Sequence, residues 1–353
     1  MAAIPPLPRR VRPVLCASRA KTYDSLMTSH LLQVNDLTVE FDSDDGVVHA
    51  VNQVSFHLDA GEALGLVGES GCGKSVTSMS IPRLVPSPPG RRVSGQIEFA
   101  GRDLTTLPLP ELRKLRGQEI GVIFQEPMTA LSPLHRIGEQ LDEVIRLHRD
   151  QPAPERRALW LDWLRRVGIA DAERCAKAYP FELSGGMRQR VMIAMAMLLE
   201  PQLVIADEPT TALDVTIQAQ ILDLLHQVTE DSAKPRALLL ITHDLGVIWE
   251  MCTRVIVMYG SRIMEEAPAQ ELFNHPLHPY SQGLLASIPS LQNDPQKLSS
   301  IPGTVPSLLN PPSGCPFAPR CPKATDVCRN TLPPRCETTI GHFVACHQVE
   351  GVR

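Results

Sequence analysis

Gly68-Glu69-Ser70-Gly71-Cys72-Gly73-Lys74-Ser75 fits the pattern G-x-x-x-x-G-K-[ST] at every position. The apolar residues 64–67 before it predict a buried strand, and residues 76–81 after it predict the first turns of a helix. A strand, a glycine-rich loop and a helix in this order form the context in which the pattern marks a nucleotide site. The alternative is an ordinary glycine turn in front of a helix.

All eight residues of this loop are candidates for nucleotide binding. The glycines let backbone N–H groups converge on a phosphate, and the helix N-terminus adds a partial positive charge. Lys74 would reach the β- and γ-phosphates, and the Ser75 hydroxyl would bind Mg²⁺. The loop predicts that a nucleotide binds, but not what the nucleotide is used for.

The composition predicts an ordinary soluble globular protein. The 353 residues are enough for one large domain and a smaller one. With 43% hydrophobic residues, 21% charged residues and a net charge of −5, the chain has no nucleic-acid-binding signature. No window approaches the roughly 18 consecutive apolar residues needed to cross a bilayer. Any membrane role would therefore come through a partner protein.

The first 26 residues are rich in arginine and proline and lack the apolar core of a secretion signal. We expect residues 1–30 to be a disordered extension, or a start that lies too far upstream, with Met27 as the true initiator. A basic transit peptide is the alternative.

Residues 31–41 and 47–58 are apolar-rich and are joined by a polar segment that ends in Asp45-Gly46. Alternation and the Asp-Gly turn predict an antiparallel β region. Phe41 is the candidate for stacking on the nucleotide base, and a phenylalanine of the core is the alternative.

The middle of the chain changes character after a strand over residues 120–124 that ends on Gln125. Helical spacing of apolar residues predicts a small helical subdomain over residues 134–183, inserted in an α/β core. Trp160 and Trp163 are expected to be its packing core.

Ser184-Gly185-Gly186 predicts a second glycine-rich helix start, with Ser184 as the N-cap. A helix N-terminus attracts anions, so this is a second possible phosphate contact, although S-G-G alone is common in loops.

Two apolar strands end in polar side chains that suit phosphate chemistry. Residues 203–206 lead into Asp207 and Glu208, and residues 238–242 lead into His243. Parallel strands of open α/β sheets place their chemistry at their carboxyl ends. Asp207 suits the shell of a Mg²⁺ ion and Glu208 suits a base that polarises water. His243 is a further catalytic candidate at the same edge.

The tail differs from the rest of the chain in its prolines and cysteines. Residues 269–353 hold 13 of the 32 prolines, which we take as too many for regular helices or sheet interiors. Five of the nine cysteines also lie there: Cys315, Cys321, Cys328, Cys336 and Cys346. Such density predicts a metal or cluster, although the spacing lacks the paired C-x₂-C of zinc knuckles. The four scattered cysteines indicate a reducing compartment without disulfides.

In combination, residues 31–268 resemble the ATP-binding-cassette (ABC) ATPases. Gln125 matches the Q-loop glutamine of that family, residues 183–189 the signature motif, residues 203–208 the second phosphate motif and His243 the switch histidine. Ala212-Leu213-Asp214 matches the D-loop, which adds Asp214 to the nucleotide-binding candidates. The resemblance implies a P-loop α/β cassette with an antiparallel β subdomain and an inserted helical subdomain.

The resemblance also implies a mechanism. Two cassettes would pair head to tail, so that Ser184, Gly185 and Gly186 contact the γ-phosphate of an ATP held by the partner. Glu208 would polarise the attacking water, and His243 would brace the γ-phosphate. Gln125 would sense Mg²⁺ and the water, and it would face a transmembrane partner.

The tail narrows the resemblance to the D-type ATPases of oligopeptide and dipeptide importers. The segments at residues 273–280, 301–303 and 314–317 are similar to the C-terminal extension of that group. This implies two transmembrane permease subunits, a second cassette that is a paralogue, and an extracytoplasmic solute-binding protein. It places the chain on the cytoplasmic face of the cell membrane. Related importers carry nickel, glutathione or oligosaccharides instead of peptides.

Relatives in this group hold a [4Fe–4S] cluster in the tail. The resemblance implies Cys315, Cys321, Cys328 and Cys346 as its ligands, with Cys336 outside the family pattern. Zinc at the same thiolates, or no metal, are the alternatives.

Two other classes of function fit the sequence less well. A soluble cassette ATPase that acts on nucleic acid or the ribosome usually has tandem cassettes, long coiled coils or a basic linker, none of which is present. A P-loop kinase or GTPase would have no use for the signature motif.

Overall fold

The computed structural model describes residues 30–210, 215–229, 235–288 and 300–349. Met27 and all but the last residue of the expected disordered segment, residues 1–30, lie outside the described part, whereas His30 lies within it. Among the described helices, none combines the length and the apolar character that crossing a bilayer requires.

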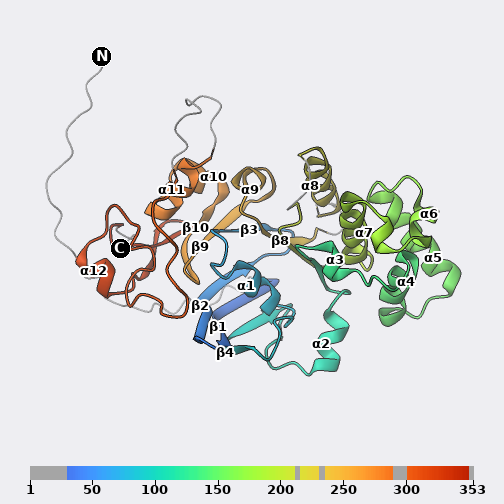
Figure 1. The fold of residues 1–353 in the computed structure, drawn as a ribbon, viewed down its shortest axis with the longest axis horizontal. Coiled ribbons are helices and arrows are strands. Elements are labelled where there is room, and N and C mark those ends of the chain that lie inside the picture. The colour runs from blue at the N-terminus through green and yellow to red at the C-terminus, as the bar shows by residue number, and fades with distance from the viewer. Residues whose placement is uncertain (1–29, 211–214, 230–234, 289–299, 350–353) are drawn as a thin grey trace, which may run out of the picture.

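An eight-stranded mixed sheet forms the centre of the molecule (Figure 1). Its order is β11-β12-β10-β9-β3-β8-β7-β6. The strands β9, β3, β8, β7 and β6 are parallel, whereas β10, β12 and β11 add on in antiparallel fashion. In that order the strands are Arg335–Thr339, His342–Ala345, Arg262–Pro268, Arg254–Tyr259, Ala63–Val67, Ala237–Ile241, Leu203–Asp207 and Ile120–Ile123.

A second, four-stranded antiparallel sheet covers one face of the central sheet, in the order β2-β1-β4-β5. Its strands are β1 (Leu32–Ser43), β2 (Gly46–Leu58), β4 (Gly90–Phe99) and β5 (Arg102–Asp103). β1 and β2 form the predicted hairpin, with Ser43 paired to Gly46 across the turn.

Alternate residues of the central strands enter two different cores. Val204 and Leu238 pack with the helices on one face, and Ile205 and Leu239 pack with the antiparallel sheet on the other. Burial on both faces explains why these strands read as continuous apolar runs in the sequence.

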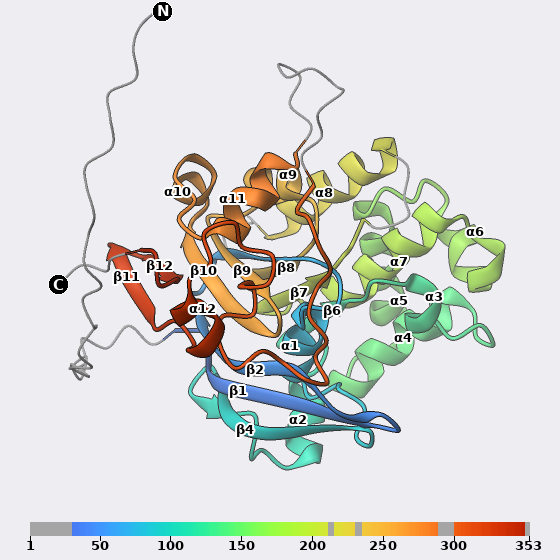
Figure 2. The ribbon, with the colours of Figure 1, turned by 60° about the vertical axis from the view of Figure 1, so that its left-hand side comes forward.

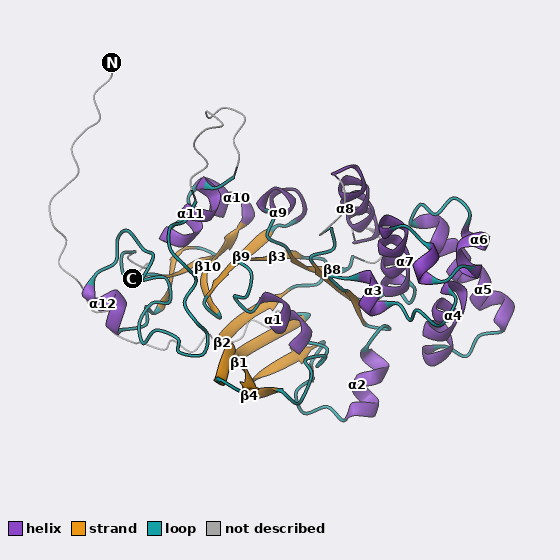
Figure 3. Cartoon of the chain, in the orientation of Figure 1, coloured by secondary structure: helices purple, strands orange, loops and turns teal. Residues whose placement is uncertain are grey.

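The helices follow the expected α/β order and gather in one place as an all-helical group. In Figure 3, α4, α5, α6 and α7 lie together on the right-hand side, with no strand among them. Trp160 and Trp163 are buried there, which confirms them as packing residues. Helices of the cassette are α1 (Lys74–Ser80), α2 (Leu109–Leu115), α3 (Pro127–Ala130), α4 (Ile137–His148), α5 (Ala153–Arg166), α6 (Ala172–Lys177), η1 (Pro180–Glu182), α7 (Gly185–Met197), α8 (Val215–Thr229) and α9 (Leu245–Met251).

The expectation that prolines exclude regular structure from the tail was wrong. The tail forms α10 (Ala269–Asn274), α11 (Pro279–Ala286), α12 (Asp326–Asn330) and the strands β11 and β12. Pro268 is the N-cap of α10 and Pro279 is the first residue of α11, where a missing N–H costs nothing. Figure 2 shows β11 and β12 beside β10, where they continue the central sheet.

Candidate nucleotide site

The glycine-rich loop leaves the carboxyl end of β3 and leads into α1. Gly68 has a φ of 153°, and a Cβ there would lie 2.2 Å from the Met258 carbonyl oxygen. Gly73 has a φ of 100°, and its Cβ would lie 2.2 Å from the Ala50 carbonyl oxygen. Glycine is therefore required at both positions, by conformation and by space.

The loop presents its backbone and short side chains to solvent while its lysine is held inside. Ser70, Gly71 and Ser75 are exposed, whereas Cys72 is fully buried in the core beneath the loop. Burial raises the pKa of the Cys72 thiol, and its sulfur lies 3.9 Å from the Lys74 Nζ. The Lys74 Nζ donates to the Gly68 and Glu69 carbonyl oxygens at 2.8 and 3.1 Å, which keeps its charge at the loop.

Ser75 and Asp207, the predicted Mg²⁺ ligands, lie together. The Ser75 Oγ donates to the Asp207 Oδ1 at 3.1 Å, and Asp207 is only 3% exposed. Burial raises the pKa of Asp207, and the hydrogen bond from Ser75 opposes that change. Hydroxyl and carboxylate oxygens next to a phosphate loop are the ligands that Mg²⁺ prefers, so the pair fits that ion.

The three predicted catalytic side chains meet at Glu208. The Gln125 Nε2 donates to one Glu208 carboxylate oxygen at 3.0 Å, and the His243 Nδ1 lies 3.4 Å from the other. They come from the ends of β6, β7 and β8, which are neighbours in the sheet. His243 is 63% exposed and so remains open to a ligand on its solvent side.

The signature residues lie apart from the loop of their own chain. The Ser184 Oγ accepts the Met187 N–H at 3.3 Å and caps α7, as predicted. A Cβ at Gly185 would meet nothing within 4 Å, whereas one at Gly186 would lie 3.1 Å from the Ile217 side chain. Figure 1 shows α7 in the helical group, away from α1.

Two predicted ligands of the nucleotide are less defined. Phe41 is half-buried in β1, opposite Val48 and Gly90, and packs against the core beneath the antiparallel sheet. Its stacking role stays a prediction. Asp214, with the whole Ala212-Leu213-Asp214 segment, lies outside the described residues.

Two contacts of Glu69 in the loop were not predicted. The Glu69 N–H donates to the Tyr280 hydroxyl at 2.8 Å, and the Glu69 carboxylate accepts two bonds from Arg320, at 2.6 and 3.1 Å. Both partners belong to the tail. A separation of 211 and 251 residues leaves no local signal for such pairing in the sequence.

Four tail cysteines gather in the structure: Cys315, Cys321, Cys328 and Cys346. Burial raises the pKa of the Cys315 thiol to about 11, and Cys346 and Cys328 add to that shift. Burial also raises the pKa of Cys346, with contributions from Cys321 and Cys328. Cys336 lies on β11, opposite Val344. These contributions link the four thiols that the family pattern selects.

The spacing of these thiols bears on which group they fit. Within the described ranges, no three of them lie within 4.8 Å of one another. A zinc ion with four thiolates at about 2.3 Å would bring the sulfur atoms to roughly 3.8 Å. A cluster in which each thiolate binds its own iron would hold the sulfur atoms further apart than a zinc ion does.

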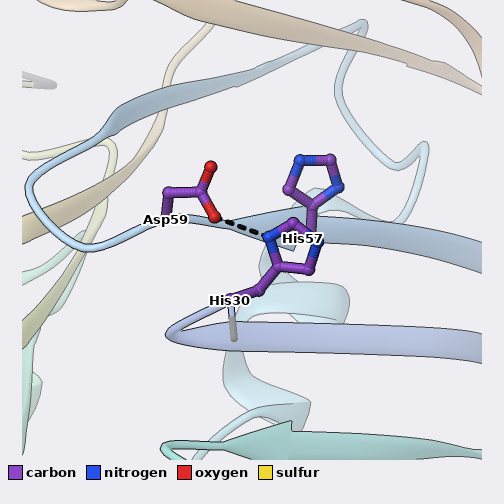
Figure 4. Close-up of side chains that lie close together, drawn as sticks. All are labelled: His30, His57 and Asp59. Carbon is purple, nitrogen blue, oxygen red and sulfur yellow. Dashed lines mark hydrogen bonds and ion pairs between the residues drawn. The ribbon is translucent and has the colours of Figure 1, made fainter. Parts of the chain in front are cut away.

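His30, His57 and Asp59 form another compact group (Figure 4). The His30 Nδ1 lies 2.5 Å from an Asp59 carboxylate oxygen, and the two imidazole rings are 4.1 Å apart. Burial lowers the pKa of His57, and the charge of Arg254 lowers it further. A neighbouring guanidinium disfavours a second cation, and the group lies before the amino end of β3, whereas the glycine-rich loop follows its carboxyl end. We assign it no part in the nucleotide site.

Two family models match the chain. They are the ABC transporter model over residues 51–211 and the oligopeptide/dipeptide transporter C-terminal region over residues 264–328. The chain is 50% identical over 317 residues to a probable peptide ABC transporter ATP-binding protein of Sinorhizobium fredii, covering 90% of this chain and 94% of that relative. It is 48% identical over 316 residues to the oligopeptide transport ATP-binding protein OppD of Salmonella typhimurium, covering 90% and 93%.

Solved structures of ABC cassettes also match the chain, at lower sequence identity. The ATP-binding cassette MJ0796, dimeric and bound to ADP and Pi, has a TM-score of 0.60 and 28% identity, covering 67% of this chain and 98% of that one. The cassette cbiO1 of Clostridium perfringens has a TM-score of 0.58 and 26% identity, covering 70% and 91%.

Proposed function

This chain belongs to the ABC transporter ATPases of the oligopeptide/dipeptide group, and we propose that it is the ATP-hydrolysing subunit that powers peptide import. One observation carries the proposal. Gln125 and His243 both reach Glu208 beside the phosphate loop, in a chain whose tail matches the C-terminal region of peptide transporters.

The chemistry of the site is hydrolysis of the γ-phosphate of ATP. Lys74 and the loop amides would bind the phosphates, and Ser75, Asp207 and Gln125 would hold Mg²⁺, which would neutralise phosphate charge. Glu208 orients the water that attacks the γ-phosphorus and accepts its proton, while the bond to ADP breaks. His243 donates toward the γ-phosphate oxygens.

A second cassette completes the site, because the signature residues lie away from their own phosphate loop. The open space at Gly185 supports this arrangement, since a partner's γ-phosphate can approach α7 there without meeting a side chain. We propose a head-to-tail pair with a paralogous subunit. The other partners are two transmembrane permease subunits, with Gln125 facing one of them, and an extracytoplasmic solute-binding protein.

This assignment makes the chain a peripheral protein on the cytoplasmic face of the cell membrane. Purification from detergent-solubilised membranes is the test. We expect two permease subunits and a second cassette to co-purify with the tagged chain, and peptides to stimulate ATP hydrolysis once the solute-binding protein is added. Stimulation by nickel, glutathione or an oligosaccharide instead would identify that compound, rather than a peptide, as the transported solute. Stimulation of the isolated chain by DNA or ribosomes would refute the transporter assignment.

We further propose that Cys315, Cys321, Cys328 and Cys346 hold a [4Fe–4S] cluster, which would cross-link the tail. The electrostatic influence of these thiols on one another's pKa supports this. Anaerobically purified protein should be brown and contain iron. A colourless protein that contains zinc would show that the four thiolates bind zinc instead of an iron–sulfur cluster.

A further inference from the structure

Arg320 is a fully hydrogen-bonded cation at the edge of the phosphate loop. Its side chain is 5% exposed, and each of its five N–H donors has a partner. Two donors bind the Glu69 carboxylate, at 2.6 and 3.1 Å. The others reach the Tyr259 hydroxyl and the carbonyl oxygens of Ile301 and Pro302, at 3.0 to 3.2 Å.

Glu69 is an unusual partner, because it is itself part of the loop that binds phosphate. Its carbonyl oxygen accepts a hydrogen bond from Lys74, and its N–H is bonded to the fully buried Tyr280. Its carboxylate thus belongs to the loop that receives the negative charges of ATP. A carboxylate there would repel the phosphates and compete with them for Lys74, unless another cation neutralised it.

We propose that Arg320 is a positioning residue of the nucleotide site, which neutralises Glu69 and so allows the phosphate loop to carry an acidic side chain. The bidentate geometry fixes the carboxylate so that it points at the tail. This role lies beyond ATP hydrolysis itself and makes the tail a part of the phosphate-binding machinery. The proposal needs only that the loop binds nucleotide.

Arg320 is held in place by the segment that contains the tail cysteines. Arg320 lies between Cys315 and Cys321, and its own N–H donates to the Phe317 carbonyl oxygen at 3.0 Å. Phe317 packs against both Tyr259 and Tyr280. The guanidinium is therefore positioned by a buried aromatic group of side chains rather than by a flexible loop.

The test is binding of a non-hydrolysable MgATP analogue to the full chain, measured by calorimetry. We expect Arg320→Gln to weaken binding about tenfold, which corresponds to about 1.4 kcal/mol. Glu69→Gln should bind within threefold of the parent. The double variant, which leaves no unpaired charge, should bind like Glu69→Gln. Arg320→Lys should be intermediate, because it keeps the charge and loses the bidentate geometry.

Salt separates neutralisation from a merely structural role. The deficit of Arg320→Gln should shrink as the ionic strength rises, because screening weakens the repulsion between Glu69 and phosphate. Arg329→Gln is the matched control, since Arg329 forms an exposed ion pair with Asp326 in the same tail. It should bind like the parent.

Two results would overturn the inference: parent-like binding by Arg320→Gln, or a double variant as weak as Arg320→Gln. Should Arg320→Gln fail to fold, Arg320→Lys takes its place, measured once in the parent and once in the Glu69→Gln background. The substitution should then weaken binding in the parent and leave it unchanged in the Glu69→Gln background, and an equal loss in both would overturn the inference. An unaltered chain that binds no nucleotide would instead refute the proposed function.

Discussion

At the scale of single residues, Glu208 has the most constrained position in the site. It has a φ of 46°, in the left-handed region that side chains other than glycine seldom adopt. Its N–H donates to the Ile241 carbonyl oxygen at 2.8 Å, which ties it to β8. Backbone strain of this kind clusters at functional sites, and here it aims the carboxylate at Gln125 and His243.

Glu208→Gln is expected to bind ATP and to lose turnover by a hundredfold or more, because an amide cannot accept the proton of water. ATP should hold the variant in a closed pair of cassettes. Phosphate release and size-exclusion chromatography measure the two effects. Glu111→Gln removes an exposed carboxylate paired with Lys114 and serves as the control. Near-normal turnover in Glu208→Gln would contradict the assigned role.

Individual site residues were predictable where the signal is local. Lys74 and Ser75 follow from one loop, and Asp207, Glu208 and His243 follow from polar residues directly after apolar strands. Parallel strands with aligned carboxyl ends bring such residues together. Arg320 was not predictable, since its partner Glu69 is 251 residues away and is an unspecified position of the loop pattern.

At the scale of elements, α7 has an N-terminus with open space beside its first residue, Gly185. Gly185→Ala should leave the unfolding free energy within about 0.5 kcal/mol of the parent, because a Cβ meets nothing within 4 Å. Hydrolysis by the assembled transporter should nevertheless fall at least tenfold, since a misplacement of about 1 Å is costly in catalysis. Thermal unfolding and ATPase assays check both. Unchanged hydrolysis would mean that no phosphate approaches Gly185.

The start of α11 makes stability depend on pH. The His278 Nδ1 accepts the Tyr280 N–H at 3.0 Å, and burial lowers the pKa of His278 to about 4. The unfolded chain therefore binds this proton first as the pH falls below about 6.5. Stability from this group is complete above that pH and is lost between about 6.5 and 4, by roughly 3 kcal/mol in total.

His278→Asn should flatten this dependence, because asparagine keeps an acceptor for Tyr280 and does not ionise. Between pH 7 and 4.5 the parent should lose roughly 2–3 kcal/mol more than the variant. Chemical unfolding at the two pH values measures the difference. Glu265 is also buried, but hydrogen bonds from His342 and from the Leu277 and His278 amides hold its pKa low. Its effect on stability therefore begins only at a pH below the ordinary pKa of a glutamate. If the unfolding free energy falls equally with pH in the parent and the variant, His278 is not the source of this pH dependence.

The helices and strands themselves were predictable where apolar residues recur with a helical or strand period. The strands of the cassette and α4 appear close to where the apolar pattern placed them. The tail elements were missed because proline counts do not reveal position: Pro279 starts α11 instead of breaking it. Pairing of β12 with β10 is long-range and has no signature in either segment.

At the scale of the whole molecule, the five tail cysteines comprise the four proposed cluster ligands and Cys336, which lies on β11. Serine at Cys315, Cys321, Cys328 or Cys346 should each remove most of the iron, because one thiolate ligand is lost. Cys336→Ser is the matched control and should retain it. Iron content per chain and visible absorbance report the outcome. Equal loss in all five variants, or in none, would contradict the ligand set.

The continuation of the central sheet by β12 and β11 limits how the protein can be rearranged. Glu265 and Glu266 of β10 pair with Val344 and Phe343. A chain cut after residue 268 would leave β10 as a bare edge, with unpaired backbone groups that recruit other strands and promote aggregation. Chimaeras between importers should therefore exchange β10 to β12 as one block, together with the phosphate loop that the same tail touches. A tail exchanged alone would have to pair with a β10 and contact a phosphate loop that come from a different importer and do not match it.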